Sequence, residues 1–145
     1  MFFGDVLNKG SVPAMEKMLA FTQARQRMLA ENIANIDTPY YQTKQLDARA
    51  FQGALREALT EQQRTGSSAF RIRGSDEFEQ DPSGRLVVTP TVEPAENLLF
   101  HDQTNARIER QMALVAENAM MHQTVTELLN GRFKSLLEAI RGRVA

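Results

Sequence analysis

The C-terminal third of the chain carries the feature that most restricts its fold, an unbroken repeat of mostly apolar positions. From about residue 103 onward, these side chains recur at alternating spacings of four and three residues. The positions of this seam are Ile108, Met112, Val115, Ala119, His122, Thr126, Leu129, Phe133, Leu136 and Ile140. Such a repeat predicts one α-helix of about 36 residues, roughly 50 Å long. A second stripe beside the seam contains Leu114, Met121, Val125 and Leu128, so the helix should need more than one packing partner.

A second long helix is predicted near the N-terminus. Ser11 is a favourable N-cap, and Pro13 is tolerated in the first turn of a helix. The seam that follows is Met15, Leu19, Thr22, Gln26, Leu29, Ile33 and Ile36, and a second stripe contains Met18, Phe21, Met28 and Asn35. Two such helices predict a mainly α fold.

The end of the N-terminal helix is marked by a polar stretch around Pro39. The proline ring disfavours helical backbone at the preceding Thr38, so the helix should end near Ile36. Asn32 and Asn35 are three residues apart and share a helix face, and Asn and Thr side chains can bond the last free carbonyls of a helix. The residues alone leave two interpretations open, an ordinary helix end or a rigid corner with a fixed exit direction.

A shorter helix is predicted next along the chain. Leu46 and Asp47 have the pattern of a hydrophobic staple and an N-cap, and the helix should span about 48–62. Its apolar side would consist of Phe51, Leu55 and Leu59.

The middle of the chain, residues 63–102, differs in pattern and is expected to be a flexible segment with a small β-hairpin. The hairpin should lie around 77–92, because Asp81-Pro82-Ser83-Gly84 places turn residues where a type I turn favours them. Pro90 and Pro94 limit further strand pairing. The helical parts, 1–62 and 103–145, would then form one discontinuous domain.

Composition excludes several classes of function. The 17 basic and 18 acidic side chains nearly cancel, so no net field favours nucleic acid or an acidic membrane surface. The chain has no cysteine, which excludes disulfides and thiolate metal sites. No stretch is long and apolar enough for a direct membrane span, and the N-terminus lacks the pattern of a cleaved secretory signal. A protein with this N-terminus would need another route out of the cytoplasm.

No motif in the chain predicts catalysis or a cofactor. His101 and His122 are far apart, whereas a metal pair on one helix would need histidines four residues apart. There is neither a glycine-rich phosphate loop nor a nucleophile elbow. Carboxylates lie among arginines, as with Glu138 and Arg141, which is typical of solvated helix faces. We therefore expect no enzyme, no metal and no cofactor.

Two stretches together resemble the rod and hook axial proteins of the bacterial flagellum. The first is Asn32-Ile33-Ala34-Asn35-Ile36-Asp37-Thr38-Pro39-Tyr40-Tyr41, which is similar to the family signature Asn-Ile-Ala-Asn-x-x-Thr-Pro-Gly-Tyr at the end of the N-terminal helix. The second is the terminal helix, with Glu117-Asn118-Ala119 and the ending Leu136-Leu137-Glu138-Ala139-Ile140-Arg141-Gly142. The short length, the Asp-Thr-Pro variant and the Ile-Arg-Gly ending resemble most the proximal rod members of the family.

The resemblance implies a structural role in the flagellar basal body. Family members pair their N- and C-terminal helices as an antiparallel, coiled-coil-like unit that stacks helically around the central export channel, while the middle segment contacts neighbouring subunits. The chain would polymerise in the proximal rod, the drive shaft that spans the periplasm. Implied partners are copies of the chain, other rod proteins, ring or adaptor components of the basal body, and the flagellar type III apparatus, which exports family members without a cleaved signal. A cytoplasmic coiled-coil adaptor or export chaperone is the alternative that the repeats alone also permit.

The resemblance also implies which residues determine assembly. The motif positions are Asn32, Ile33, Ala34, Asn35, Thr38, Pro39, Tyr41, Glu117 and Asn118, and the packing seam is Met15, Leu19, Leu29, Ile33, Ile108, Met112, Val115, Leu129, Phe133, Leu136 and Ile140. Phe3 and Leu7 are candidates for an export signal. The chain departs from the signature at one position, because Tyr40 replaces the glycine after proline. A turn with positive φ there would be strained, or another turn type would replace it.

Overall fold

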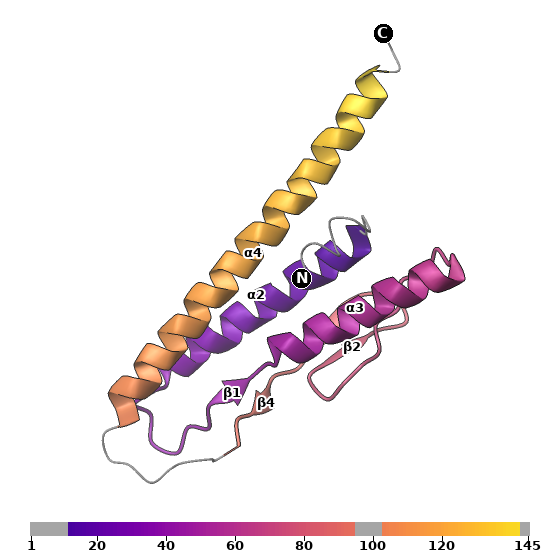
Figure 1. Ribbon diagram of the computed structural model, residues 1–145. Helices are drawn as coiled ribbons and strands as arrows, with labels where there is room; N and C mark the ends of the chain where they lie inside the picture. The colour runs from indigo at the N-terminus through magenta and orange to yellow at the C-terminus, as the bar shows by residue number, and fades with distance from the viewer. Residues whose placement is uncertain (1–11, 95–102, 143–145) are drawn as a thin grey trace.

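The computed structural model describes residues 12–94 and 103–142, and in these ranges the chain is mainly helical (Figure 1). Its helices are α2 (Val12–Ala34), α3 (Ala48–Thr65) and α4 (Gln103–Gly142). Four short strands lie between the long helices in sequence: β1 (Lys44–Gln45), β2 (Phe78–Gln80), β3 (Leu86–Val88) and β4 (Thr91–Val92). The expectation of a mainly α fold with a short helix and a small β region between two long helices is confirmed.

The two long helices lie side by side and run in opposite directions (Figure 1). Asn32 near the end of α2 contacts Gln111 near the start of α4, and Thr22, further back along α2, contacts His122. The 40 residues of α4 form a helix of about 60 Å at 1.5 Å per residue, so it extends well past the first turn of α2. Gly131 lies inside α4 without interrupting it.

Helix α2 ends at Ala34, slightly before the predicted position near Ile36. The N–H of Asn35 still bonds the carbonyl of Glu31, as in an α-helix. The next N–H, that of Ile36, bonds the carbonyl of Ile33 instead, which tightens the chain into a turn. The chain therefore leaves the helical path before Pro39 requires it.

Helix α3 begins at Ala48, directly after Asp47, the N-cap that the sequence predicted. The Asp47 carboxylate accepts hydrogen bonds from the N–H groups of Arg49 and Ala50, at 2.9 and 3.0 Å. The helix continues to Thr65 rather than ending at Gln62, because Gly66 adopts the left-handed conformation, with φ 64°, that commonly ends a helix.

The predicted hairpin is present as the antiparallel pair β2–β3, with Phe78 opposite Val88. The N–H of Gly84 bonds the carbonyl of Asp81 at 2.9 Å, and Gly84 has a φ of 86°, which suits glycine. The Asp81 carboxylate accepts from the Ser83 hydroxyl at 2.6 Å and from the Arg85 N–H at 2.9 Å. These hydrogen bonds lower the pKa of Asp81 to about 2, with the Ser83 bond contributing most.

A second strand pair was not expected from the sequence. β1 pairs with β4 in antiparallel fashion, with Lys44 opposite Val92 and Gln45 opposite Thr91. Two residues per strand carry no periodic signal, so only the tertiary structure reveals the pairing. It ties the exit from α2 to the end of the middle segment.

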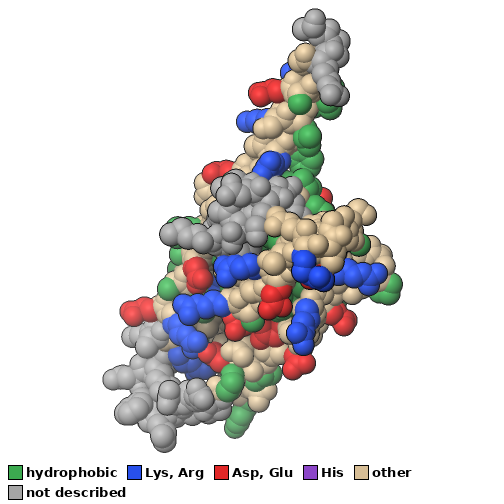
Figure 2. Space-filling view, turned by 45° about the vertical axis from the view of Figure 1, so that its right-hand side comes forward, with side chains coloured by type: hydrophobic (Ala, Val, Ile, Leu, Met, Phe, Trp, Pro, Cys, Tyr) green, Lys and Arg blue, Asp and Glu red, His purple; other side chains and the backbone are tan. Residues whose placement is uncertain are grey.

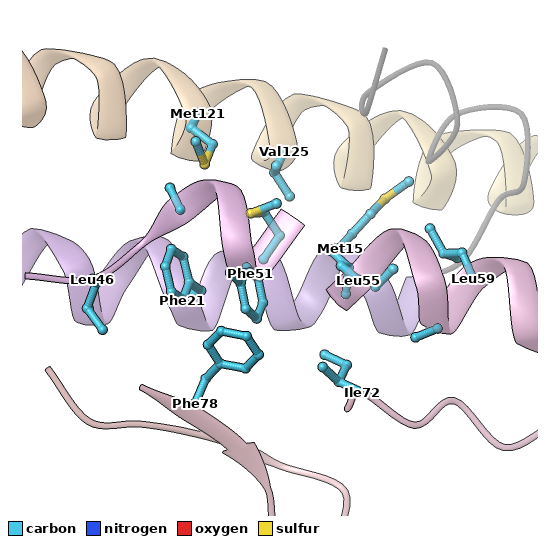
Figure 3. Close-up of a cluster of buried hydrophobic side chains, with 14 of the residues drawn as sticks. Met15, Phe21, Leu46, Phe51, Leu55, Leu59, Ile72, Phe78, Met121 and Val125 are labelled. Atoms are coloured by element: carbon cyan, nitrogen blue, oxygen red, sulfur yellow. The ribbon is translucent and has the colours of Figure 1, made fainter. Parts of the chain in front are cut away.

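The hydrophobic core joins all three helices with the middle segment (Figure 3). The rings of Phe21 and Phe51 stack with their centroids 4.1 Å apart, and Phe78 meets Phe51 edge-on at 5.1 Å. Such pairs add about 0.5 to 1.5 kcal/mol beyond the burial of their area. Phe70 and Ile72 also belong to this core. Part of the 63–102 segment is thus packed on the helices, and its predicted flexibility and its division from the helical domain stay predictions.

Candidate functional site

The motif residue Asn32 is the centre of a junction between three segments. Its side chain is buried, with 2% of the residue exposed. The amide nitrogen donates to the carbonyl of Lys44 at 2.8 Å and to the Gln111 side chain at 3.3 Å. The amide oxygen accepts from the Lys44 N–H at 2.9 Å and from the Tyr41 hydroxyl at 3.1 Å. The Asn32 side chain therefore uses all of its hydrogen-bonding capacity to join α2 to Tyr41, to β1 and to α4.

Two neighbours of Asn32 complete this junction. Burial raises the pKa of the Tyr41 phenol, and the Glu31 carboxylate raises it further. The ammonium group of Lys44 forms an ion pair with Glu31 at 2.8 Å, and this bond raises the pKa of Lys44. Tyr41 consequently remains a hydrogen-bond donor to Asn32 throughout the neutral pH range.

The corner, residues 35–41, satisfies the free groups at the end of α2 locally. The Asn35 side chain donates to the carbonyl of Glu31 at 2.9 Å and accepts from the Thr38 hydroxyl at 3.3 Å. The N–H of Thr38 bonds the carbonyl of Asn35 at 2.9 Å, and the N–H of Tyr41 bonds the carbonyl of Thr38 at 3.2 Å. Successive turns thus give the chain a defined exit direction. Pro39 is exposed and contributes through its backbone restriction.

Tyr40 occupies the left-handed backbone region, with a φ of 63°. It is the one non-glycine residue with positive φ within 12–94 and 103–142. The positive-φ turn is therefore kept although glycine is replaced, at a cost of about 1 to 2 kcal/mol for an ordinary L-residue. The Tyr40 side chain is fully exposed, so no contact within the described chain offsets this strain.

The second motif lies further along the same helix pair. Asn118, 1% exposed, donates to the carbonyl of Thr22 and to the Gln26 side chain, both at 2.9 Å. Glu117 lies 3.7 Å from the guanidinium of Arg25. The two motifs, far apart in sequence, therefore mark two polar contacts between α2 and α4.

Beyond the Asn118 contact, toward the start of α2, the helix interface holds further polar groups. The Thr22 hydroxyl donates to the carbonyl of Leu19 at 3.0 Å and lies 2.8 Å from Nδ1 of His122. His122 thus has a structural hydrogen bond in the helix pair.

Three buried side-chain atoms in this interface have no hydrogen-bond partner in the described chain. They are Nε and Nη1 of Arg25 and Oδ1 of Asn118. An unpaired buried polar atom costs about 1 to 3 kcal/mol. The polar side chains between α2 and α4 therefore give less stability than apolar residues in the same places would. Polar groups in a helix interface instead favour one register, because any shift leaves more of them unpaired.

The seam residues fall into two groups in the structure. On α2, Met15 and Leu29 are buried, and Leu19 and Ile33 are half-buried. On α4, Ile108, Val115 and Leu129 are half-buried, whereas Met112, Phe133, Leu136 and Ile140 are exposed. The most buried apolar residues of α4 are Met121 and Val125 of the neighbouring stripe (Figure 3). The stripe that faces α2 in one chain is therefore not the predicted seam, and more than half of that seam is exposed.

The other predicted positions have clear locations. Ala34 is the last residue of α2 and is exposed. Phe3 and Leu7 lie outside the described residues. Sequence reasoning did not find Arg25 or Gln111. Gln111 lies seven residues before Asn118, and this heptad spacing is the signal that could have placed both on the face toward α2.

The described residues contain no group of three or more His, Cys, Asp or Glu side chains that could hold a metal ion. A small cleft beside Asn32, bordered by Arg107 and Arg110, has a volume of about 30 Å³. Arg110 forms an ion pair there with Glu93 at 2.6 Å. Separately, no helix of the described chain is long and apolar enough to cross a membrane.

Comparison with curated proteins finds relatives along nearly the whole chain. A protein of Bacillus subtilis named flagellar basal body rod protein FlgB is 27% identical over 136 residues, which cover 94% of this chain and 97% of the relative. Proteins with the same name from Cereibacter sphaeroides and Aquifex aeolicus are 31% and 27% identical. These matches cover 86% and 88% of this chain, and 88% and 90% of the relatives. No family model matches the chain. No solved structure matches it either.

Proposed function

The chain belongs to the FlgB family of flagellar basal body rod proteins and is a structural component of that rod, and from this premise we propose that its α2–α4 pair is the unit that polymerises. In this proposal the two helices form an antiparallel, coiled-coil-like pair that lines the export channel of the proximal rod. The corner then directs the chain outward to β1, α3 and the hairpin, which contact neighbouring subunits.

The observation that carries the proposal is the location of the two motifs in the helix interface. Asn32 bonds Gln111 at one end of the pair, and Asn118 bonds Thr22 and Gln26 in its middle. A shift of α4 along α2 would separate both sets of partners and leave buried amides unpaired. A regular helical assembly needs every subunit to have the same length and register, which these contacts would enforce.

The partners in this proposal are copies of the chain, other rod proteins, and ring or adaptor components of the basal body. The family resemblance supports export by the flagellar type III apparatus without a cleaved signal, with Phe3 and Leu7 as candidate signal residues. The mature location would be the part of the rod that spans the periplasm. The names of the relatives give no support to the alternative of a cytoplasmic adaptor or chaperone.

The variant Asn118→Leu tests the register argument. Leucine has as many side-chain heavy atoms as asparagine and removes an unpaired buried oxygen, and the exposed Gln26 side chain can bond water instead, so the isolated protein should keep its stability. Rod assembly should fall, because α4 can then pair with α2 in more than one register. The measurement is the amount of the chain in basal bodies purified from a strain that lacks its own copy.

The matched control is Met120→Leu, on the same helix but 68% exposed. It should assemble like the unchanged chain. If Asn118→Leu is found in basal bodies as abundantly as this control, the buried amide does not govern assembly. If deletion of residues 1–10 leaves the location of the chain unchanged, the proposed export route is wrong.

A further inference from the structure

The last turns of α4 present an apolar surface that nothing in the described chain covers. This distal stripe consists of Phe133, Leu136, Leu137 and Ile140, which are between 47% and 63% exposed. It lies on the part of α4 that extends beyond the start of α2 (Figure 1). Figure 2 shows hydrophobic side chains in a row along one edge of this projecting part. An uncovered row of large apolar residues on a helix marks an interaction surface.

The corner presents the opposite kind of feature, a single projecting aromatic side chain. Tyr40 is fully exposed at the connection between α2 and β1, and its backbone is held in the left-handed region. Glycine would form this turn with less strain, and the exposed ring makes no contact within the described chain that would offset the difference. A tyrosine can bury a large apolar area at little cost in side-chain freedom, which makes it a frequent anchor of interfaces.

The two features are complementary in charge as well. The corner carries the carboxylate of Asp37 and no basic residue, whereas the carboxylate of Glu31 just before it is paired with Lys44. The stretch 132–142 contains Arg132, Lys134 and Arg141 against the single carboxylate of Glu138. Charges of opposite sign beside two apolar surfaces favour their approach and set its orientation.

We propose that the distal stripe of α4 in one copy of the chain binds the corner of a second copy, with Tyr40 as the anchor. The corner and the distal stripe lie at opposite ends of the molecule, so one chain cannot satisfy its own stripe with its own corner (Figure 1). A contact between two different surfaces at opposite ends does not close on itself and repeats as an open helical series. The inference rests on the proposed polymerisation and names the surfaces through which one copy follows another.

The test uses the absence of natural cysteine in the chain. Full-length Tyr40→Cys and Leu136→Cys proteins, each with a different affinity tag, are mixed and oxidised, and the mixed disulfide is measured on a non-reducing gel. The control mixture pairs Tyr40→Cys with Met120→Cys, an exposed position on the same helix but outside the stripe. The proposal predicts that the 40–136 disulfide forms at least about tenfold faster than the 40–120 disulfide, because the contact raises the local concentration of the two thiols.

Three results would overturn the proposal. One is equal rates for the two mixtures. Another is a predominance of Leu136→Cys homodimers, which would show that two α4 helices meet. The third is slow labelling of dilute Leu136→Cys protein by a thiol reagent, which would show that residues 1–11 of the same chain cover the stripe. The proposed function is tested separately by the presence of the unchanged chain in basal bodies, so that either proposal can fail alone.

Discussion

Replacing Asn32 with alanine should destabilise the fold by about 2 to 3 kcal/mol. The change removes four hydrogen bonds, each worth about 0.5 to 1.5 kcal/mol net. Water can replace part of this loss at Tyr41 and Lys44, which are only half-buried, but not at Gln111, which is 5% exposed. Urea unfolding followed by far-UV circular dichroism gives the change in unfolding free energy. Hydrogen exchange of the Lys44 amide, which donates to Asn32, should accelerate in parallel.

The matched control for this prediction is Asn35→Ala in the same motif. Asn35 makes two hydrogen bonds on the exposed surface of the corner, so its loss should cost about 0.5 kcal/mol or less. The prediction is wrong if the unfolding free energy of Asn32→Ala is within about 0.5 kcal/mol of that of the unchanged chain, or if it falls no further than that of Asn35→Ala. The Asn32 junction would then not hold the three segments together.

Three further changes test other parts of the structure. Tyr40→Gly should raise the unfolding free energy by about 0.5 to 1 kcal/mol, because the relief of backbone strain exceeds the added chain entropy of glycine. A lower thermal unfolding temperature than that of the unchanged chain would contradict this. An NMR titration should find the Asp81 pKa at about 2, and Ser83→Ala should raise it toward the usual range. Because this pKa is lowered on folding, the contribution of Asp81 to stability is complete above its unfolded pKa, about 4, and is lost as pH falls through about 2. Phe51→Ala should lower the unfolding free energy measured in urea by about 3 to 5 kcal/mol, and a loss below about 1 kcal/mol would show that the cluster of Phe21, Phe51 and Phe78 does not hold the core together.

Elements with strong local signals could be predicted from the sequence. The long apolar repeat was sufficient for α4, the Asp47 cap for the start of α3, and the Asp81–Gly84 turn for the hairpin. Each of these signals depends on residues close together in the chain. Their conformational preferences are therefore the same before and after the tertiary structure forms.

Contacts between distant segments could not be predicted in the same way. Helix α4 has two apolar stripes of similar composition, and only the partner determines that Met121 and Val125, rather than Leu136, face the core. The β1–β4 pair is too short to leave a periodic pattern, and the burial of Phe78 depends on Phe51 lying beneath it. The resemblance placed Asn32 and Asn118 in one functional group, but their separate partners across the helix interface come from the structure alone.

The most direct test of the proposed helix pair is cryo-microscopy of purified basal bodies at a resolution that shows side chains. We predict that this chain lies in the rod with α2 and α4 paired along the channel, and that Asn32 contacts Gln111 while Asn118 contacts Gln26 in every copy. It would be contradicted if α2 and α4 of one chain were apart in the rod, or if they were paired in a register that separates these side chains.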